Sequence, residues 1–296
     1  MKTVLLSVSI FLMMCISTTA QRTATATHLP FAQMLVKDSS WQLNKAVELR
    51  KIVYIDKEGK KVVLQVLEAR LRRKGLHLKA ATAEGQGILG RQSVQAEMAA
   101  AQRPGRQVLA GVNADFFNMK TGQPLGPVIK EGQVLKQSFH GTNAYVGVEK
   151  SGRIRIGDSS DFKNHKHQFV EALGAKPLLI LDKQLMQQDS SSLSTVHHPR
   201  TALGIKARGK KLIFLVVDGR QPAYSNGISL GDLSLVLKWL GATGAVNLDG
   251  GGSTTLVVAT KQSGSKGQGQ GYQVLNKPSD GSARSVANSW MIVKDK

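Results

Sequence analysis

Residues 247–253, Asn-Leu-Asp-Gly-Gly-Gly-Ser, form the segment of this chain whose residue types best suit chemistry. An apolar stretch ends here in an amide and a carboxylate. The three glycines allow positive φ angles or a close approach of the backbone to another group. A carboxylate beside accessible backbone N–H groups suits a polar ligand that carries phosphate or sugar. A tight hairpin in which Asp249 caps its own turn would give the same pattern, so both interpretations stay open.

Three other segments share this arrangement, in which a predicted buried strand ends in polar residues at a turn. They contain Asn113 with Asp115, Arg200, and Asp218 followed by Gly219-Arg220. Strand ends and the loops after them commonly carry functional sites. Arginine binds phosphate through paired hydrogen bonds and carboxylates transfer protons, so the combined inventory matches a phosphate-linked sugar. Each segment alone also fits a plain turn or a satisfied buried amide.

Other catalytic chemistries find less support in the residues. The histidines between positions 165 and 198 lie in polar, loop-like sequence, and no glycine pattern of a nucleophile elbow surrounds a serine. A Ser-His-Asp triad is therefore not indicated. The sequence requires no cofactor, although Asp115, Asp218 and Asp249 could together hold Ca²⁺ or Mg²⁺, which prefer carboxylate oxygens. The adjacent pair His197-His198 could bind a metal, but neighbouring loop histidines are more often solvated.

Alternating and helical patterns predict the elements that must position these residues. The expected strands cover residues 62–67, 76–80, 108–117, 128–129, 134–135, 145–148, 154–156, 176–181, 201–206, 212–218 and 285–293. Helices are expected at 93–102 and 229–240, the second with a Ser229/Asp232 capping pattern and a terminal Gly241. Strands outnumber helices, and we find neither a linker nor an internal repeat. The sequence thus predicts an α+β fold, a single domain of mixed, mostly antiparallel sheet with a few helices.

The N-terminus has the pattern of a secretory signal peptide over residues 1–20, with cleavage expected near Ala20. The protein is therefore expected to be exported, either periplasmic or secreted. The only cysteine, Cys15, lies in this segment, and the large Met14 before it argues against a lipoprotein anchor. We expect a flexible arm over 21–40 and the folded domain over 41–296. No later stretch is long and apolar enough to cross a membrane.

The chain is strongly basic, with 40 Lys and Arg against 20 Asp and Glu and a formal net charge of +20. Such a charge attracts polyanions, among them nucleic acids, anionic lipids and phosphate-bearing glycopolymers. Aromatic residues are sparse and no helix-turn-helix or finger pattern is present, which argues against nucleic acid. A phosphate-bearing glycan or glycopolymer is the expected partner. Nothing in the sequence sets the oligomeric state.

Taken in order, the motifs between residues 105 and 293 resemble those of the phosphodiester glycosidase family. The resemblance implies an exported or lumenal hydrolase that cleaves the C1–O bond of a sugar-1-phosphodiester, such as an N-acetylglucosamine-1-phosphodiester. The products would be the free sugar and a phosphomonoester. Residues 21–105 carry no motif that we can match to the family.

The resemblance and the chemistry of the residues together define a predicted site. The catalytic candidates are Asp249, Asp218 and Asn247, and the substrate-binding candidates are Asn113, Asp115, Arg200, Gly250, Gly251, Gly252, Ser253 and Arg284. We expect Asp249 to act as base or nucleophile and Asp218 to bind or support the sugar. Arg200 and Arg284 are expected to contact phosphate.

Asp115 departs from the family pattern, because Ala114-Asp115 stands where two small residues, often Gly-Gly, are expected. Asp115 could fill a pocket, tune substrate choice or ligate another group. Two alternative functions fit the same residues. One is a phosphodiesterase that cleaves the P–O bond at two metal ions. The other is a non-catalytic module that binds phosphate-bearing glycopolymers.

Overall fold

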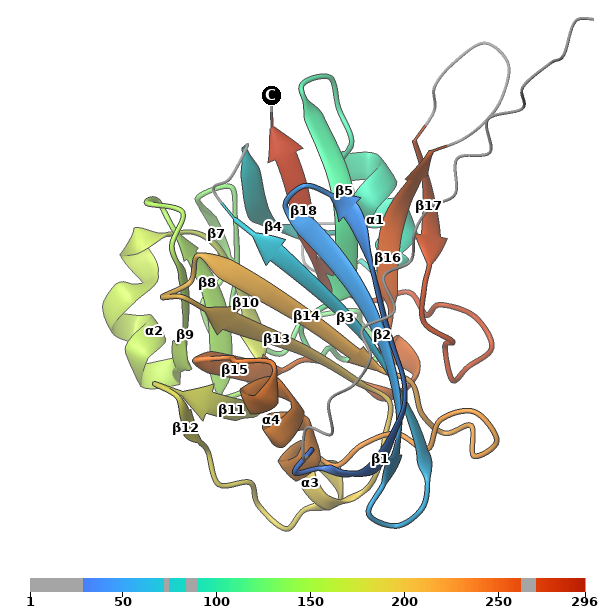
Figure 1. The fold of residues 1–296 in the computed structure, drawn as a ribbon. Helices are drawn as coiled ribbons and strands as arrows, with labels where there is room; N and C mark the ends of the chain where they lie inside the picture. Colours follow the sequence, from blue (N-terminus) through green and yellow to red (C-terminus); the bar gives the residue numbers. More distant parts are fainter. Residues whose placement is uncertain (1–28, 72–74, 84–89, 262–269, 296) are drawn as a thin grey trace, which may run out of the picture.

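Three antiparallel sheets make up most of the protein (Figure 1), whose computed structural model describes residues 29–71, 75–83, 90–261 and 270–295. The predicted α+β class is confirmed in a sheet-dominated form. Every pairing between the described strands is antiparallel, so the expected mixture of strand directions is not found. The predicted signal peptide lies outside the described residues.

The largest sheet has eight strands and crosses the centre of the molecule (Figure 1). In spatial order its strands are β1 (Ala32–Asn44), β2 (Val47–Asp56), β3 (Lys61–Arg70), β14 (Lys211–Val217), β13 (Arg200–Lys206), β15 (Gly244–Asn247), β11 (Leu178–Leu181) and β12 (Gln184–Leu185).

Strand β1 corrects the predicted flexible arm, because residues 32–40 form a strand that pairs with β2. Phe31, just before it, packs edge-on against Tyr54 and Trp239. The Thr/Ala-rich composition predicted a loose segment. That prediction was wrong for residues 32–40, because the segment is held by residues distant in the sequence, such as Trp239. The part of the arm before residue 29 lies outside the described residues.

Two five-stranded sheets cover one face of the large sheet. One contains β17 (Gln270–Val274), β16 (Leu256–Lys261), β5 (Arg106–Asn113), β18 (Asn288–Asp295) and β4 (Leu76–Thr82). The other contains β7 (Gln133–Lys136), β6 (Val128–Lys130), β10 (Phe169–Ala175), β8 (Ala144–Glu149) and β9 (Ile154–Asp158). The helices are α1 (Val94–Ala101), α2 (Ser159–His165), α3 (Ser192–Thr195) and α4 (Leu230–Trp239), with short 3-10 turns at Lys166–Gln168 and Gly251–Ser253.

The cores lie on both faces of the large sheet. In β14, Phe214 and Val216 pack between the sheets, whereas Leu215 and Val217 face the layer that contains α4. This burial on both faces explains why the strand reads as a continuous apolar run. The predicted helix 229–240 is confirmed as α4. Its Ser229 hydroxyl accepts a hydrogen bond from the Asp232 N–H at 3.1 Å.

Strands from two sheets end together, and this determines where the polar residues meet. In the large sheet, β13 begins at Arg200 beside the ends of β14 and β15, because it runs antiparallel to both. In the neighbouring sheet, β18 begins at Asn288 beside the end of β5 at Asn113. The strand predicted at 108–117 ends at Asn113 in the structure. The residues that follow leave the sheet and contact the loop after β15, where the Ala114 carbonyl accepts the Asp249 N–H.

Candidate active site

The glycine run after β15 forms a tight loop held by protein contacts. Asp249 N–H donates to the Ala114 carbonyl at 2.8 Å, and Gly251 N–H donates to the Pro199 carbonyl at 2.9 Å. Gly251 has φ +59°, a left-handed conformation that favours glycine. A Cβ at Gly252 would overlap the Arg284 side chain. The glycines thus let other groups approach the backbone closely. The sequence interpretation of this segment as a ligand-binding loop requires such an approach.

Asp249 is half-buried and stands at the start of this loop. One carboxylate oxygen accepts the Gly250 N–H at 2.9 Å. Burial raises the pKa of Asp249 to about 6, while Ser253, the Gly250 N–H and Arg284 oppose that rise. The carboxyl group is therefore mostly ionised at neutral pH, and it titrates within reach of physiological conditions. Both properties suit a general base or nucleophile.

Two guanidinium groups flank the glycine loop. Arg284 is held by Asp280 through hydrogen bonds of 3.1 and 2.6 Å. Arg220 is exposed, and its Nη1 would lie 3.1 Å from a Cβ placed on Gly251. Sequence reasoning did not select Arg220 as a site residue, although Asp-Gly-Arg after a strand was noted. Its φ of +57°, unusual for arginine, marks a constrained position of the kind found at functional sites.

Arg200 has surroundings different from those expected of a phosphate ligand. Its side chain is buried, and its guanidinium donates to the carbonyls of Ile228 at 3.2 Å, Val196 at 3.0 Å and Leu193. Burial, with a contribution from Arg220, lowers the pKa of Arg200 to about 10. Because these carbonyls engage Nε and Nη2 of the buried guanidinium, we assign Arg200 to holding the loops before α4 and seek the phosphate contact elsewhere.

Asp218 follows β14 and is also buried. Its carboxylate accepts hydrogen bonds from the Lys277 N–H at 2.9 Å, the Asn276 amide at 3.2 Å and the Tyr224 hydroxyl at 3.3 Å. Burial raises the pKa of Asp218 to about 6, against the effect of these donors. The Asn276 amide also donates to the Thr254 carbonyl at 3.0 Å. Asp218 therefore supports the far side of the glycine loop.

The two predicted amides are buried positioning groups. Asn113 donates to the Asp249 carbonyl at 2.6 Å, and it accepts from the Thr201 hydroxyl at 2.7 Å and the Thr255 N–H at 3.0 Å. Asn247 donates to the Lys176 carbonyl at 2.6 Å. The Asn247 Oδ1 has no hydrogen-bond partner among the described residues. Asn113 thus connects β5 to the strand ends of the large sheet and fixes the backbone of Asp249.

Asp115 fills a space between two glycines. Its Oδ2 accepts the Gly126 N–H at 2.7 Å, and it would lie 2.7 Å from a Cβ placed on Gly174. Burial raises the pKa of Asp115 to about 8, opposed by the Gly126 N–H and Lys136 and reinforced by Asp249. Of the three roles considered for Asp115, filling a pocket is the one that these contacts match.

The candidate metal ligands are not clustered. Within the described parts of the chain, no group of three or more His, Cys, Asp or Glu side chains is placed to hold a metal ion. A cation held jointly by Asp115, Asp218 and Asp249 therefore finds no support in the geometry. His197 and His198 face different neighbours, the first 3.0 Å from the Asn226 amide and the second 3.5 Å from Arg220.

No helix in the described residues is long and apolar enough to cross a membrane.

Comparison with known proteins identifies the family of the chain. A family model of phosphodiester glycosidases matches residues 106–293, the segment that carries the strand ends and the glycine loop. The chain belongs to the phosphodiester glycosidase family. The resemblance inferred from the motifs is thereby confirmed.

Several vertebrate proteins are similar to this family member. N-acetylglucosamine-1-phosphodiester alpha-N-acetylglucosaminidase from Mus musculus is 28% identical over 162 residues, which is 49% of this chain and 31% of that protein. The Homo sapiens enzyme of the same name gives the same identity and shares. These matches span less than a third of the relatives' length. The zebrafish catalytic domain of that name shares the fold, with a TM-score of 0.66, 22% identity, and coverage of 87% of this chain and 88% of that one.

Proposed function

We propose that this protein is a hydrolase that cleaves the C1–O bond of a sugar-1-phosphodiester, such as an N-acetylglucosamine-1-phosphodiester. Membership of the phosphodiester glycosidase family supports the reaction class, and the names of the mouse and human relatives support the sugar. The observation that carries the proposal is the placement of Asp249, a half-buried carboxylate at a glycine loop that Arg220 and Arg284 flank.

The chemistry follows from the charges of the substrate. Breaking a C1–O bond requires stabilisation of positive charge at the anomeric carbon, which a nearby carboxylate provides. The leaving phosphate group is a weak base and needs little protonation, so the guanidinium groups of Arg220 and Arg284 can stabilise it instead. Asp249 then acts as the base that activates water or as the nucleophile. Asp218 and Asn113 keep the loop in place.

The proposal extends to export and to the natural substrate. The signal-peptide pattern over residues 1–20 supports export to the periplasm or the medium. The net charge of +20 favours encounters with phosphate-bearing glycans outside the cytoplasm. N-terminal sequencing of the protein recovered from its host tests export, and the expected first residue is Gln21. An intact Met1 in the recovered protein would contradict it.

The reaction is tested by incubating the purified protein with an N-acetylglucosamine-α-1-phosphodiester in ¹⁸O-labelled water. Label in the free sugar, with unlabelled phosphomonoester, is the expected result and identifies C1–O cleavage. Label in the phosphate would instead identify a P–O phosphodiesterase. Binding without turnover, on this and other sugar phosphodiesters, would favour the non-catalytic module.

Two variants connect the turnover to the assigned residue. Asp249→Asn should abolish turnover while the melting temperature stays close to that of the parent protein. Asp182→Asn is the matched control, because Asp182 lies exposed in the turn between β11 and β12 with φ +47°, which asparagine tolerates. Full turnover by a folded Asp249→Asn protein would refute the assignment.

A further inference from the structure

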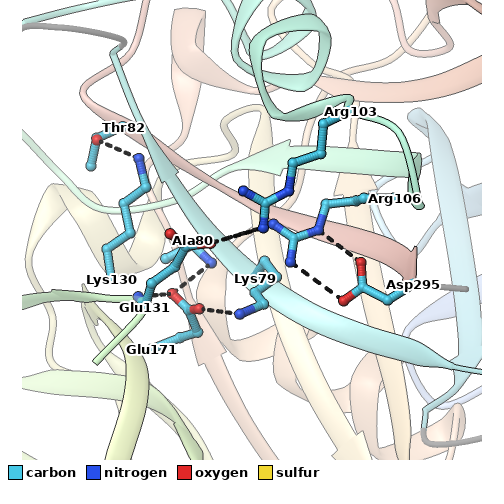
Figure 2. A network of polar contacts seen from close by, with 9 residues as sticks. All are labelled: Lys79, Ala80, Thr82, Arg103, Arg106, Lys130, Glu131, Glu171 and Asp295. Carbon is cyan, nitrogen blue, oxygen red and sulfur yellow. Dashed lines mark hydrogen bonds and ion pairs between the residues drawn. The ribbon is translucent and has the colours of Figure 1, made fainter. Parts of the chain in front are cut away.

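A cavity of about 170 Å³ lies beside α1, where β4 and β6 approach each other. Basic side chains from four segments line it, namely Lys79, Lys130, Arg103 and Arg106. Figure 2 shows these side chains together with the carboxylates that contact them. The lining also includes the apolar residues Ala101, Met291 and Val293. No role in the proposed reaction accounts for this arrangement.

The basic groups of the cavity differ in how they are neutralised. Lys79 pairs with the buried Glu171 at 3.0 Å, and Arg106 pairs with Asp295 at 2.8 Å (Figure 2). Arg103 and Arg106 share Glu131, at 3.7 and 3.4 Å. The Lys130 amine donates only to the Thr82 hydroxyl, at 3.3 Å, and forms no ion pair within the described residues. Lys130 is thus the cation of this cavity that is free to meet an anion.

Glu97, which also lines the cavity, supplies a buried carboxyl group. Only 1% of this residue is exposed, because it shares the inner face of α1 with Val94 and Met98. One of its oxygens, Oε2, accepts a hydrogen bond from the Ser289 hydroxyl. The other, Oε1, has no partner among the described residues. A buried polar atom without a partner is rare in a folded protein and needs an explanation, and a bound water or ion would supply one.

The charge balance of the cavity depends on the proton of Glu97. Burial raises the pKa of Glu97 to about 8, against the effects of the Ser289 hydroxyl and Lys130, so the group is protonated at neutral pH. Four basic side chains then face three paired carboxylates, which leaves one positive charge. Ionised Glu97 would cancel that charge. A protonated carboxyl group can also donate a hydrogen bond, whereas a carboxylate can only accept one.

We propose that this cavity is a second binding site, which takes one tetrahedral oxyanion, the phosphate or sulfate group of a small ester or the free ion, between Lys130 and Glu97. The apolar lining residues would contact the organic part of an ester. Ser289, which bonds to Glu97, follows Asn288, which accepts the Asp115 N–H at 2.8 Å on the candidate active site. Consecutive strand residues point to opposite faces, so the two sites lie on opposite sides of β18. The inference does not depend on the proposed reaction.

Isothermal titration calorimetry with sodium sulfate tests the proposal on the purified full chain. Sulfate stays a dianion at about pH 6.5 and about pH 9.5, so any change in its affinity between them reports on the protein. We expect binding at the lower pH that weakens about tenfold or more at the higher, as expected when a charge-assisted hydrogen bond is lost. Inorganic phosphate and phosphate monoesters, titrated in the same way, distinguish the sources of the anion.

Variants locate the binding. Lys130→Met should weaken sulfate binding about tenfold, the effect of losing one charge-assisted hydrogen bond, whereas the exposed Lys163→Met on α2 should leave it unchanged. Glu97→Gln keeps an acceptor for Ser289 and adds an amide donor that does not titrate. This variant should bind sulfate equally at both pH values. Absence of binding, or a pH dependence that Glu97→Gln retains, would overturn the proposal, provided that thermal unfolding shows each variant to be folded.

Discussion

The raised pKa of Asp249 predicts how activity should respond to acid. If the rate requires this carboxylate ionised and its pKa is about 6, the ionised fraction falls about tenfold between pH 7 and pH 5. An aspartate at the ordinary value of 3.8 would stay ionised over this range and leave the rate nearly unchanged. If Asp218, whose pKa is also about 6, must be ionised as well, the fall approaches a factor of about one hundred.

The assay is kcat/KM for the sugar phosphodiester as a function of pH at constant ionic strength. A phosphodiester does not titrate in this range, so the acid limb belongs to the enzyme. Ser253→Ala gives an independent test, because the Ser253 hydroxyl is the largest of the effects that lower the pKa of Asp249. Removing this hydroxyl, which lies near the carboxyl group without forming a hydrogen bond to it, should move the acid limb to higher pH, by about half a unit.

Ser282→Ala serves as the control, because Ser282 is exposed in the neighbouring loop and should leave the limb in place. A rate that stays flat down to pH 5 would show that burial does not shift the catalytic carboxyl group. A limb near pH 6 that Ser253→Ala fails to move would show that a group other than Asp249 titrates. Either result would refute the reasoning.

Three further changes test separate parts of the structure. Arg220→Met should lower kcat/KM about tenfold to a hundredfold, because it removes a positive charge that would stabilise the leaving phosphate. Arg153→Met, in an exposed hairpin, should leave kcat/KM unchanged, and steady-state kinetics compare the two variants. Gly252→Ala should displace Arg284 and lower both kcat/KM and the melting temperature, and calorimetry showing an unchanged melting temperature would contradict the contact. Glu171→Leu should reduce the free energy of unfolding, measured in urea, by about 3 kcal/mol or more, because it leaves two backbone N–H groups and Lys79 without their partner. A loss below about 1 kcal/mol would argue against a structural role for Glu171.

The structure also changes which arginine is the candidate for the phosphate contact. The sequence predicted phosphate contacts for Arg200 and Arg284, but the Arg200 guanidinium is buried among carbonyl groups. Arg220, two residues beyond Asp218, is exposed beside the glycine loop instead. Arg200 begins β13 and Arg220 follows the end of β14, and their packing separates a structural arginine from a candidate ligand.

The sequence by itself determined the features that depend on neighbouring residues. The apolar spacing and caps of α4, from Ser229 to Gly241, require only contacts within a turn or two of helix. The buried strand β14 and the hairpins β6–β7 and β8–β9 were likewise predictable, because their patterns and turn residues are local. The ordered motifs also identified the family, because recognising the glycine loop requires only the types and order of its residues.

Tertiary structure alone decided which polar groups are buried and what they contact. Asn113 meets Thr201, 88 positions away, because strands of two different sheets end side by side. Asp115 fills a space between glycines of other segments, and Glu97 is buried because α1 lies on β5 and β18. Burial and long-range register set the pKa values and the contacts of these groups, and neither can be read from residues a few positions apart.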